Sequence, residues 1–225
     1  LARVLGGSAR LGHVFAADRD IVLDEETLPF APASLDAVIS GPGLEFVNDL
    51  PGTLAQIGRA LRPDGLFLAV LFGGDTLSEL RASWFAAETE IEGGVSPRVA
   101  PFADVRELGG LLQRANLALP VADVDRLTVR YPSALALMRE LKAMGLANAL
   151  TARRRRLVSR MLLARAAAVY EETFSDPDGR VRATFDLVTL TAWAPAGSQQ
   201  KPLKPCSATS RLADALGTTE HKLKR

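Results

Sequence analysis

Residues 35–72, "LDAVISGPGLEFVNDLPGTLAQIGRALRPDGLFLAVLF", decide the fold. The stretch begins and ends with apolar runs of strand length, at 35–40 and 66–72. Both runs are nearly continuous rather than alternating, as in strands that are buried on both faces of a sheet. Between them, apolar residues recur at helical spacing from Leu54 to Leu61, and the Pro-Asp-Gly that follows is a stop signal. A strand, a helix and a strand in this order predict a parallel crossover.

The alternation of strands and helices continues on both sides of this unit. Two short apolar runs at 13–18 and 21–23 precede it, and a strand at 121–130 follows it. A long alternating run rich in β-branched residues, at 181–194, predicts a strand in an antiparallel setting. Helices are predicted after a cap at Asp75 or Thr76, and at 103–115, 132–144 and 151–173.

These elements predict an α/β fold of the doubly wound type. The sheet is expected to be mostly parallel with an antiparallel last strand, and a helical pair is inserted before that strand. One domain is predicted at 1–194, followed at 195–225 by an extended or mobile tail rich in Pro, Lys, Ser and Gln.

The composition restricts the class of protein. The chain has 225 residues, 48% of them apolar and 24% charged, with a net charge of +1. This balance gives no general attraction to nucleic acid. With two histidines and the single Cys206, neither an internal disulfide nor a zinc site is predicted. No apolar run is long enough to span a bilayer. The sequence predicts a soluble intracellular protein without a metal.

In doubly wound sheets, ligands bind at the carboxyl ends of the strands. Asp18 follows one predicted strand, where it could bind a ribose diol or cap a helix. Asp24 and Glu25 follow the next, where they could meet an adenine amino group or form a solvated turn. After residues 35–40, glycines at 41 and 43 suit either close approach of a ligand or a tight turn. No nucleophile motif is present, so the catalytic residue is not identified.

Several segments of the sequence resemble those of known protein families. The segments "DEETLPFAPASLDAVIS" and "FVNDLPGTLAQIGRALRPDGLFLAVLF" resemble the class I S-adenosylmethionine methyltransferases, in particular the malonyl-acyl-carrier-protein methyltransferases of biotin synthesis. The segments "FGGDTLSELR", "AETEIEGGVSPRVAPF" and "GRVRATF" resemble the respiratory complex I assembly factors that hydroxylate an arginine, together with their bacterial relatives. The resemblance extends to about Ala208. It implies a Rossmann-like fold and S-adenosylmethionine as cofactor.

The resemblance also implies roles for individual residues. Asp18 matches the acid that holds the cofactor ribose, and Asp24, with Glu25 beside it, matches the acid that meets the adenine. Ser40 and Gly41 match the strand end near the methionine part of the cofactor. The chain departs from the family pattern at Glu45 and Phe46, where relatives commonly have histidine or glutamine and then tryptophan.

Three functions are compatible with these observations. The first is methyl transfer to an unidentified oxygen, nitrogen or carbon acceptor, for which Asp75, Glu88 and Tyr131 are the candidate bases. The second is complex I assembly through hydroxylation of a protein arginine, with a respiratory subunit as partner. The third is a non-catalytic binding module. The first two imply the cytoplasm of a bacterium or the mitochondrial matrix, with peripheral membrane contact as an option and no nucleic acid as partner.

Two segments lead to specific structural predictions. Parallel neighbours need a crossover of roughly a dozen residues, which the short link around Arg19 and Asp20 cannot provide. We therefore expect that a helix is missing between Asp18 and Val22, that residues 1–5 are the end of a helix, and that the family's glycine-rich cofactor loop is absent. The second segment, "EGGVSPR" at 92–98, is predicted to be a mobile loop over the site.

Overall fold

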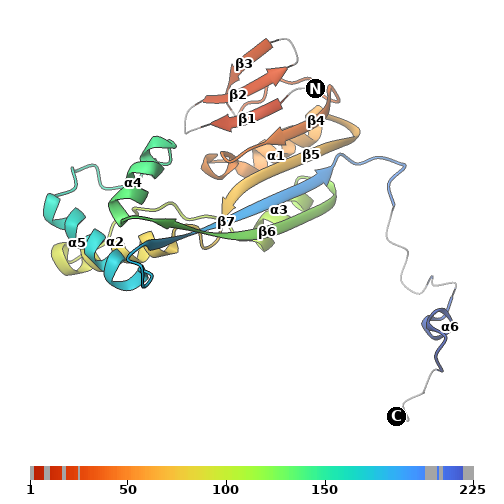
Figure 1. Ribbon diagram of the computed structural model, residues 1–225. Coiled ribbons are helices and arrows are strands. Elements are labelled where there is room, and N and C mark those ends of the chain that lie inside the picture. The colour runs from red at the N-terminus through yellow and green to blue at the C-terminus, as the bar shows by residue number, and fades with distance from the viewer. Residues whose placement is uncertain are drawn as a thin grey trace. The chain divides into compact units, whose positions relative to one another are not determined.

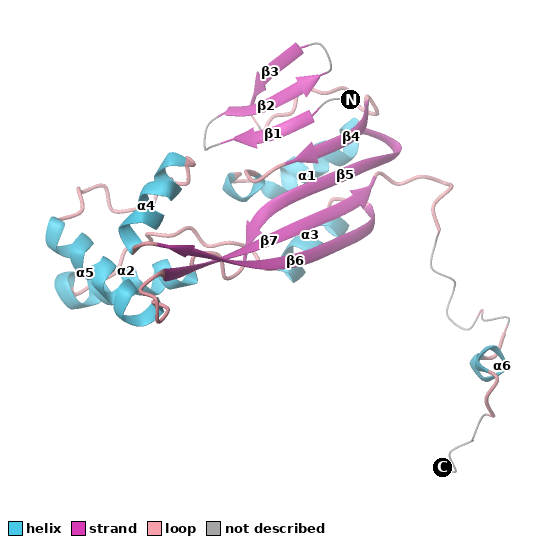
Figure 2. Cartoon of the chain, viewed as in Figure 1, coloured by secondary structure: helices cyan, strands magenta, loops and turns pink. Residues whose placement is uncertain are grey.

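The computed structural model describes residues 3–7, 11–16, 19–24, 26–200, 207 and 210–219. For Leu212 and for the described residues up to position 23, it describes the backbone alone. Residues 1–195 form one compact unit (Figures 1 and 2), and residues 196–225 form a second unit that contains the short helix α6 (Leu212–Leu216).

The larger sheet of the first unit has the strand order β4 (Leu35–Ser40), β5 (Leu61–Gly73), β7 (Val181–Trp193), β6 (Ala118–Tyr131). β4 and β5 are parallel, whereas β7 is antiparallel to both β5 and β6. β4, β5 and β6 therefore run in one direction and β7 in the other. This arrangement confirms the predicted α/β class, with a mostly parallel sheet and an antiparallel last strand.

Two helices cover one face of this sheet. The predicted crossover helix is α1 (Leu50–Ala60), which begins with a hydrogen bond of 2.9 Å from the Gly52 N–H to Asp49 Oδ1. The other is α3 (Val105–Arg114), which begins with a capping box between Asp104 and Glu107. Their apolar faces pack on alternate residues of β5 and β7 and form the first core cluster; its largest members are Leu54, Phe67, Leu71, Leu108, Leu112 and Leu190.

Three helices form a second core around the beginning of β7. They are α2 (Ser78–Glu92), α4 (Ala134–Ala143) and α5 (Arg160–Phe174), and Figure 1 shows them gathered at one end of the sheet. α4 and α5 lie between β6 and β7 in the chain, which is the predicted inserted helical pair. The residues of this cluster that are fully buried include Ala87, Leu137, Leu162, Tyr170 and Val181.

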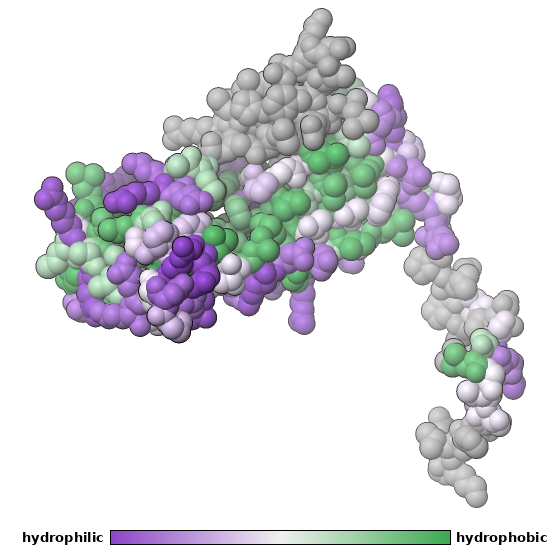
Figure 3. Space-filling model, viewed as in Figure 1, coloured by the Kyte–Doolittle hydropathy of each residue, from purple (hydrophilic) through white to green (hydrophobic). Residues whose placement is uncertain are grey.

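The other face of the sheet is covered less completely. Along β5 and β7 the residues that alternate with the first core, such as Leu66, Leu68 and Leu187, are only partly buried. On β6, Val121 is 54% exposed. Figure 3 shows apolar surface along these strands.

The first two predicted strands do not belong to the parallel sheet. β1 (Arg3–Gly7), β2 (Leu11–Ala16) and β3 (Arg19–Leu23) form a separate three-stranded sheet in which each neighbouring pair is antiparallel. Ala16 pairs with Arg19, so β2 and β3 form a tight hairpin. The prediction of a missing helix between Asp18 and Val22 is therefore wrong, and so is the helical prediction for the described residues 3–5. The physical reason is the short link, which permits only an antiparallel return.

Three element boundaries also differ from the prediction. α5 begins at Arg160 rather than at 151, because Ser159 caps it by accepting from the Leu162 N–H at 3.1 Å. α2 begins at Ser78, and Thr76 does not cap it because its hydroxyl donates to the Asp186 carbonyl at 3.2 Å. β5 begins before the Pro-Asp-Gly segment, which forms an irregularity in the pairing with β4.

Candidate functional site

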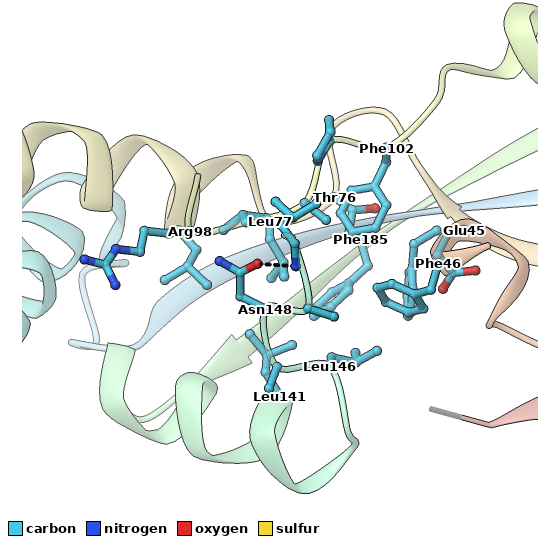
Figure 4. Close-up of a pocket in the computed structure, with 18 of the residues that line it drawn as sticks. Glu45, Phe46, Thr76, Leu77, Arg98, Phe102, Leu141, Leu146, Asn148 and Phe185 are labelled. Atoms are coloured by element: carbon cyan, nitrogen blue, oxygen red, sulfur yellow. Dashed lines mark hydrogen bonds between the residues drawn. The ribbon is translucent and has the colours of Figure 1, made fainter. Parts of the chain in front are cut away.

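A pocket lies at the edge of the sheet where the parallel strands β4 and β5 end. Its cavity volume is about 290 Å³. The short helix η1 (Leu44–Phe46) follows β4 and contributes Glu45 and Phe46, and the end of β5 contributes Phe72. Leu77 and Phe185 also line the pocket (Figure 4). This is the edge at which the sequence places a ligand site.

The loop 93–102 forms one wall of the pocket. Arg98, Pro101 and Phe102 all line the cavity. The end of the loop therefore lies against this pocket, while its predicted position over the cofactor residues and its predicted mobility stay predictions. Phe102 lies 6.3 Å from Phe72 between ring centroids, so the wall continues the apolar surface of β5.

A buried carboxylate holds this loop. Glu88 on α2 is fully buried, and its Oε1 accepts a hydrogen bond of 2.7 Å from Arg98 Nε. Its Oε2 accepts from the Ser96 N–H at 2.6 Å. The Arg98 guanidinium also lies 5.0 Å from the centre of the Trp84 ring, a cation–π arrangement. Glu88 thus uses both oxygens to fix the loop backbone and its arginine.

The opposite wall comes from the end of α4 and the segment that follows it. Leu141, Leu146 and Asn148 line the cavity there. Asn148 Nδ2 donates to the Pro97 carbonyl at 2.6 Å, and its Oδ1 accepts from the Leu150 N–H at 3.0 Å. Asn148 therefore joins the two walls. Figure 4 draws the hydrogen bond that its Oδ1 accepts within its own segment.

Glu45 is the other charged residue besides Arg98 among the described residues that line this pocket. Its Oε2 accepts from the Gly43 N–H at 2.8 Å, whereas its Oε1 is buried without a hydrogen-bond partner in the described part of the chain. Burial raises the pKa of Glu45, and hydrogen bonds from backbone N–H groups offset part of this rise. Figure 4 shows Glu45 at the end of the pocket opposite Arg98.

A polar network supports the segment between β5 and α2. Asp186 on β7 is buried, and its Oδ1 accepts from Arg126 Nε at 2.7 Å. Its Oδ2 accepts from the Asp75 N–H at 3.1 Å, and Arg126 also pairs with the Asp75 carboxylate. The hydrogen bond from Arg126 holds the pKa of Asp186 below its usual value. Asp75 is therefore engaged in fixing β6 and β7 to this loop.

None of the three candidate bases lines the pocket. Asp75 belongs to the network just described, and Glu88 is closed off by Arg98. Tyr131 is buried in the second core, and burial raises the pKa of its phenol. The structure therefore does not support these three residues as bases. The described part of the chain also contains no group of three metal-ligating side chains.

The residues predicted to bind the cofactor have different positions. Ser40 is buried at the end of β4, where its hydroxyl donates to the Gly41 carbonyl at 3.0 Å. At Gly41 a Cβ atom would meet nothing within 4 Å. Asp24 is exposed and accepts from the Glu26 N–H at 2.9 Å. Asp18 and Glu25 lie outside the described residues.

Some residues of the pocket have no signal in the sequence that would have identified them. Leu146 and Asn148 belong to the short segment between the helices predicted at 132–144 and 151–173. Glu45 has a signal, because it departs from the family pattern directly after the strand end.

Comparisons with known proteins agree with this geometry. A methyltransferase domain family matches residues 10–69. The mitochondrial arginine-hydroxylase NDUFAF5 of Homo sapiens is 44% identical over 189 residues, which is 84% of this chain and 54% of that protein. The malonyl-[acyl-carrier protein] O-methyltransferase of Laribacter hongkongensis is 40% identical over 195 residues, 86% of this chain and 63% of that enzyme. The chain thus spans little more than half of the length of these relatives.

A solved structure gives the same fold. A methyltransferase structure from Bacillus halodurans matches with a TM-score of 0.50 at 14% identity, over 77% of this chain and 70% of that one. In the described part of the chain, no helix has the length and apolarity to cross a bilayer. The chain thus has the fold of a class I methyltransferase and is similar in sequence to these relatives.

Proposed function

We propose that the chain acts in an enzyme that uses S-adenosylmethionine to modify a group held in the pocket beside Phe46 and Phe72. The observation that carries this proposal is the position of the pocket, at the carboxyl ends of the parallel strands of a methyltransferase fold. A largely apolar pocket at this edge excludes water and positions a reacting group, which is the main requirement of group transfer.

The residues proposed to hold the cofactor are Asp18, Asp24, Glu25, Ser40 and Gly41. Two of them have surroundings that fit this role. The free space beside Gly41 allows a ligand to approach the backbone, and Ser40 fixes the Gly41 carbonyl at the strand end. When bound, S-adenosylmethionine supplies a methyl group that is electrophilic because it is attached to a sulfonium. The chain would hold the acceptor in line with it.

A variant at Gly41 tests this proposal. Gly41→Ala adds a methyl group to the space in which the cofactor would lie, so the affinity for S-adenosylhomocysteine is expected to fall about tenfold by calorimetry. Gly94→Ala is the matched control, since a Cβ atom there also meets nothing within 4 Å. An unchanged affinity in Gly41→Ala would remove Gly41 from the cofactor site. Absence of any binding by the folded parent chain would contradict the function itself.

A second candidate function is hydroxylation of a protein arginine during complex I assembly. It is favoured by several relatives named arginine-hydroxylase, which are 42–45% identical to this chain, against 36–40% for the malonyl-acyl-carrier-protein methyltransferases. The partner would then be a respiratory subunit, and the compartment would be the bacterial cytoplasm or the mitochondrial matrix.

Mass spectrometry of complex I subunits from a strain that lacks the gene distinguishes the two functions. Loss of oxygen from one arginine supports hydroxylation. An unchanged set of modified arginines contradicts it and leaves methyl transfer.

A further inference from the structure

We infer that Glu45 recognises the positive charge of the S-adenosylmethionine sulfonium, so that the chain discriminates the charged cofactor from its neutral demethylated product. The inference deepens the proposed function and rests on it. Three observations carry it, which are the free oxygen of Glu45, the position of its carboxylate beside Gly43, and the aromatic lining of the pocket.

The first observation is the hydrogen bonding of Glu45. Its Oε2 accepts from the Gly43 N–H at 2.8 Å, whereas its Oε1 is buried without a hydrogen-bond partner in the described part of the chain. A buried oxygen in this state is unfavourable, and in folded proteins it needs an explanation such as a bound ligand, ion or water. The free oxygen therefore fits a group that supplies positive charge.

The charge of the pocket also favours a cation. Arg98 is the other charged residue among the described lining residues, and its Nη2 is paired with Glu88 Oε1 at 2.5 Å. When Glu45 is ionised, its negative charge is therefore not balanced by Arg98. Such a charge attracts a cation and repels an anion, and a nearby cation in turn favours the ionised form of the carboxyl group.

The second observation is the position of Glu45 next to the residues proposed to hold the cofactor. The helix η1 follows Gly43 directly, and the Gly43 N–H holds the Glu45 carboxylate against the glycine-containing segment. Gly41, in the same segment, has free space for the approach of a ligand. Figure 4 shows Glu45 at the end of the pocket opposite Arg98. The free oxygen is therefore near the proposed cofactor position rather than near the Arg98 ion pair.

The third observation is the aromatic surface between Glu45 and Arg98. Phe46, Phe72 and Phe102 line the pocket there, and the ring centroids of Phe72 and Phe102 are 6.3 Å apart. A sulfonium has no N–H or O–H group, so it cannot be held by donating hydrogen bonds as an ammonium can. Aromatic faces suit such a cation, as they suit quaternary ammonium groups. An aromatic pocket with one unpaired carboxylate oxygen therefore matches a sulfonium.

Calorimetry with three ligands and the whole chain tests this role. S-adenosylmethionine and sinefungin carry a positive charge at or beside the sulfur position, whereas S-adenosylhomocysteine is neutral there. We expect the parent to bind each charged ligand about tenfold more tightly than S-adenosylhomocysteine. Glu45→Gln keeps the shape of the side chain but not its charge, and should reduce this preference to less than about twofold. Glu171→Gln, at an exposed carboxylate on α5, is the matched control and keeps the full preference.

Two results overturn the inference. One is equal affinity of the parent for the charged and neutral ligands, which does not depend on the folding of any variant. The other is a Glu45→Gln variant that binds all three ligands more weakly by the same factor, which would mean that Glu45 contacts their common α-ammonium group. Binding of S-adenosylhomocysteine reports separately on the proposed function. If it binds to the parent and the preference for charge is absent, the inference fails while the proposed function stands.

Discussion

Glu45 is a residue at which burial opposes ionisation. Because its folded-state pKa is raised, the neutral form is favoured in the fold. The contribution of this group to stability is therefore present below the ordinary pKa near 4.5, and it is lost as the pH rises through the folded pKa. Ionisation of Glu45 therefore lowers the stability of the fold.

Replacing this carboxyl group should stabilise the protein in one range of pH. Glu45→Gln keeps the shape and an acceptor for the Gly43 N–H but cannot ionise. We expect a higher midpoint of urea unfolding than in the parent at pH 8, and a difference that shrinks towards pH 4. Denaturation curves of both proteins at the two pH values measure this effect. A constant difference, or a loss of stability at pH 8, would mean that burial does not disfavour the Glu45 charge.

Single residues at the site could be predicted from the sequence only in part. The positions of Ser40 and Gly41 follow from the end of an apolar run, and the structure has them at the end of β4. The sequence indicates Asp75 and Glu88 as candidate bases, because both are acids in segments near the open side of the predicted site. Their partners Arg126 and Arg98 lie 51 and 10 residues further along the chain, so these ion pairs become visible only in three dimensions.

At the scale of elements, the Glu88–Arg98 contact connects α2 to the loop 93–102. The loop has no regular structure, and its backbone is held by few other groups, among them Asn148. Breaking a buried ion pair leaves one charge without compensation, which costs far more than loss of an exposed pair. The loop and its pocket wall should therefore depend on this one carboxylate.

A pair of substitutions on α2 tests this dependence. Glu88→Ala leaves Arg98, whose side chain is 13% exposed, without its ion-pair partner, and the free energy of unfolding should fall by about 3–5 kcal/mol. Glu90→Ala on the same helix removes a surface pair with Arg165 and should cost about 0–1 kcal/mol. Urea denaturation followed by circular dichroism measures both values. Similar small losses in the two variants would show that the loop is held by its other contacts.

The sequence predicts elements well where the local pattern and the tertiary setting agree. The unit of β4, α1 and β5 is an example, because the two apolar runs and the helical spacing between them all favour the same order of elements. The hairpin of β2 and β3 is the opposite case. The family resemblance leads to the expectation that both strands belong to the parallel sheet, whereas Ala16 pairs with Arg19 in an antiparallel arrangement.

At the scale of the whole molecule, helices cover the two faces of the larger sheet to different extents. Parallel sheets normally have helices on both faces, because both faces carry apolar side chains. Here α1 and α3 cover one face, and the second cluster of helices covers the opposite side only near the beginning of β7. Alternate residues of β5 therefore have different surroundings, although both sets are apolar. The sequence could not reveal this difference, since a continuous apolar strand has no polar face.

The difference in burial between the two faces should be measurable within β5. Leu71 is 1% exposed and packs in the first core, so Leu71→Ala should lower the free energy of unfolding by about 2–5 kcal/mol, through lost burial and the cavity left behind. Leu68 lies on the other face and is only partly buried, so the same truncation removes less buried surface there. We expect Leu68→Ala to cost less than half as much in urea denaturation and to weaken binding of an apolar dye to the native protein. Equal losses in the two variants would mean that the second face is covered as fully as the first, and unchanged dye binding would mean that the exposed apolar surface lies elsewhere.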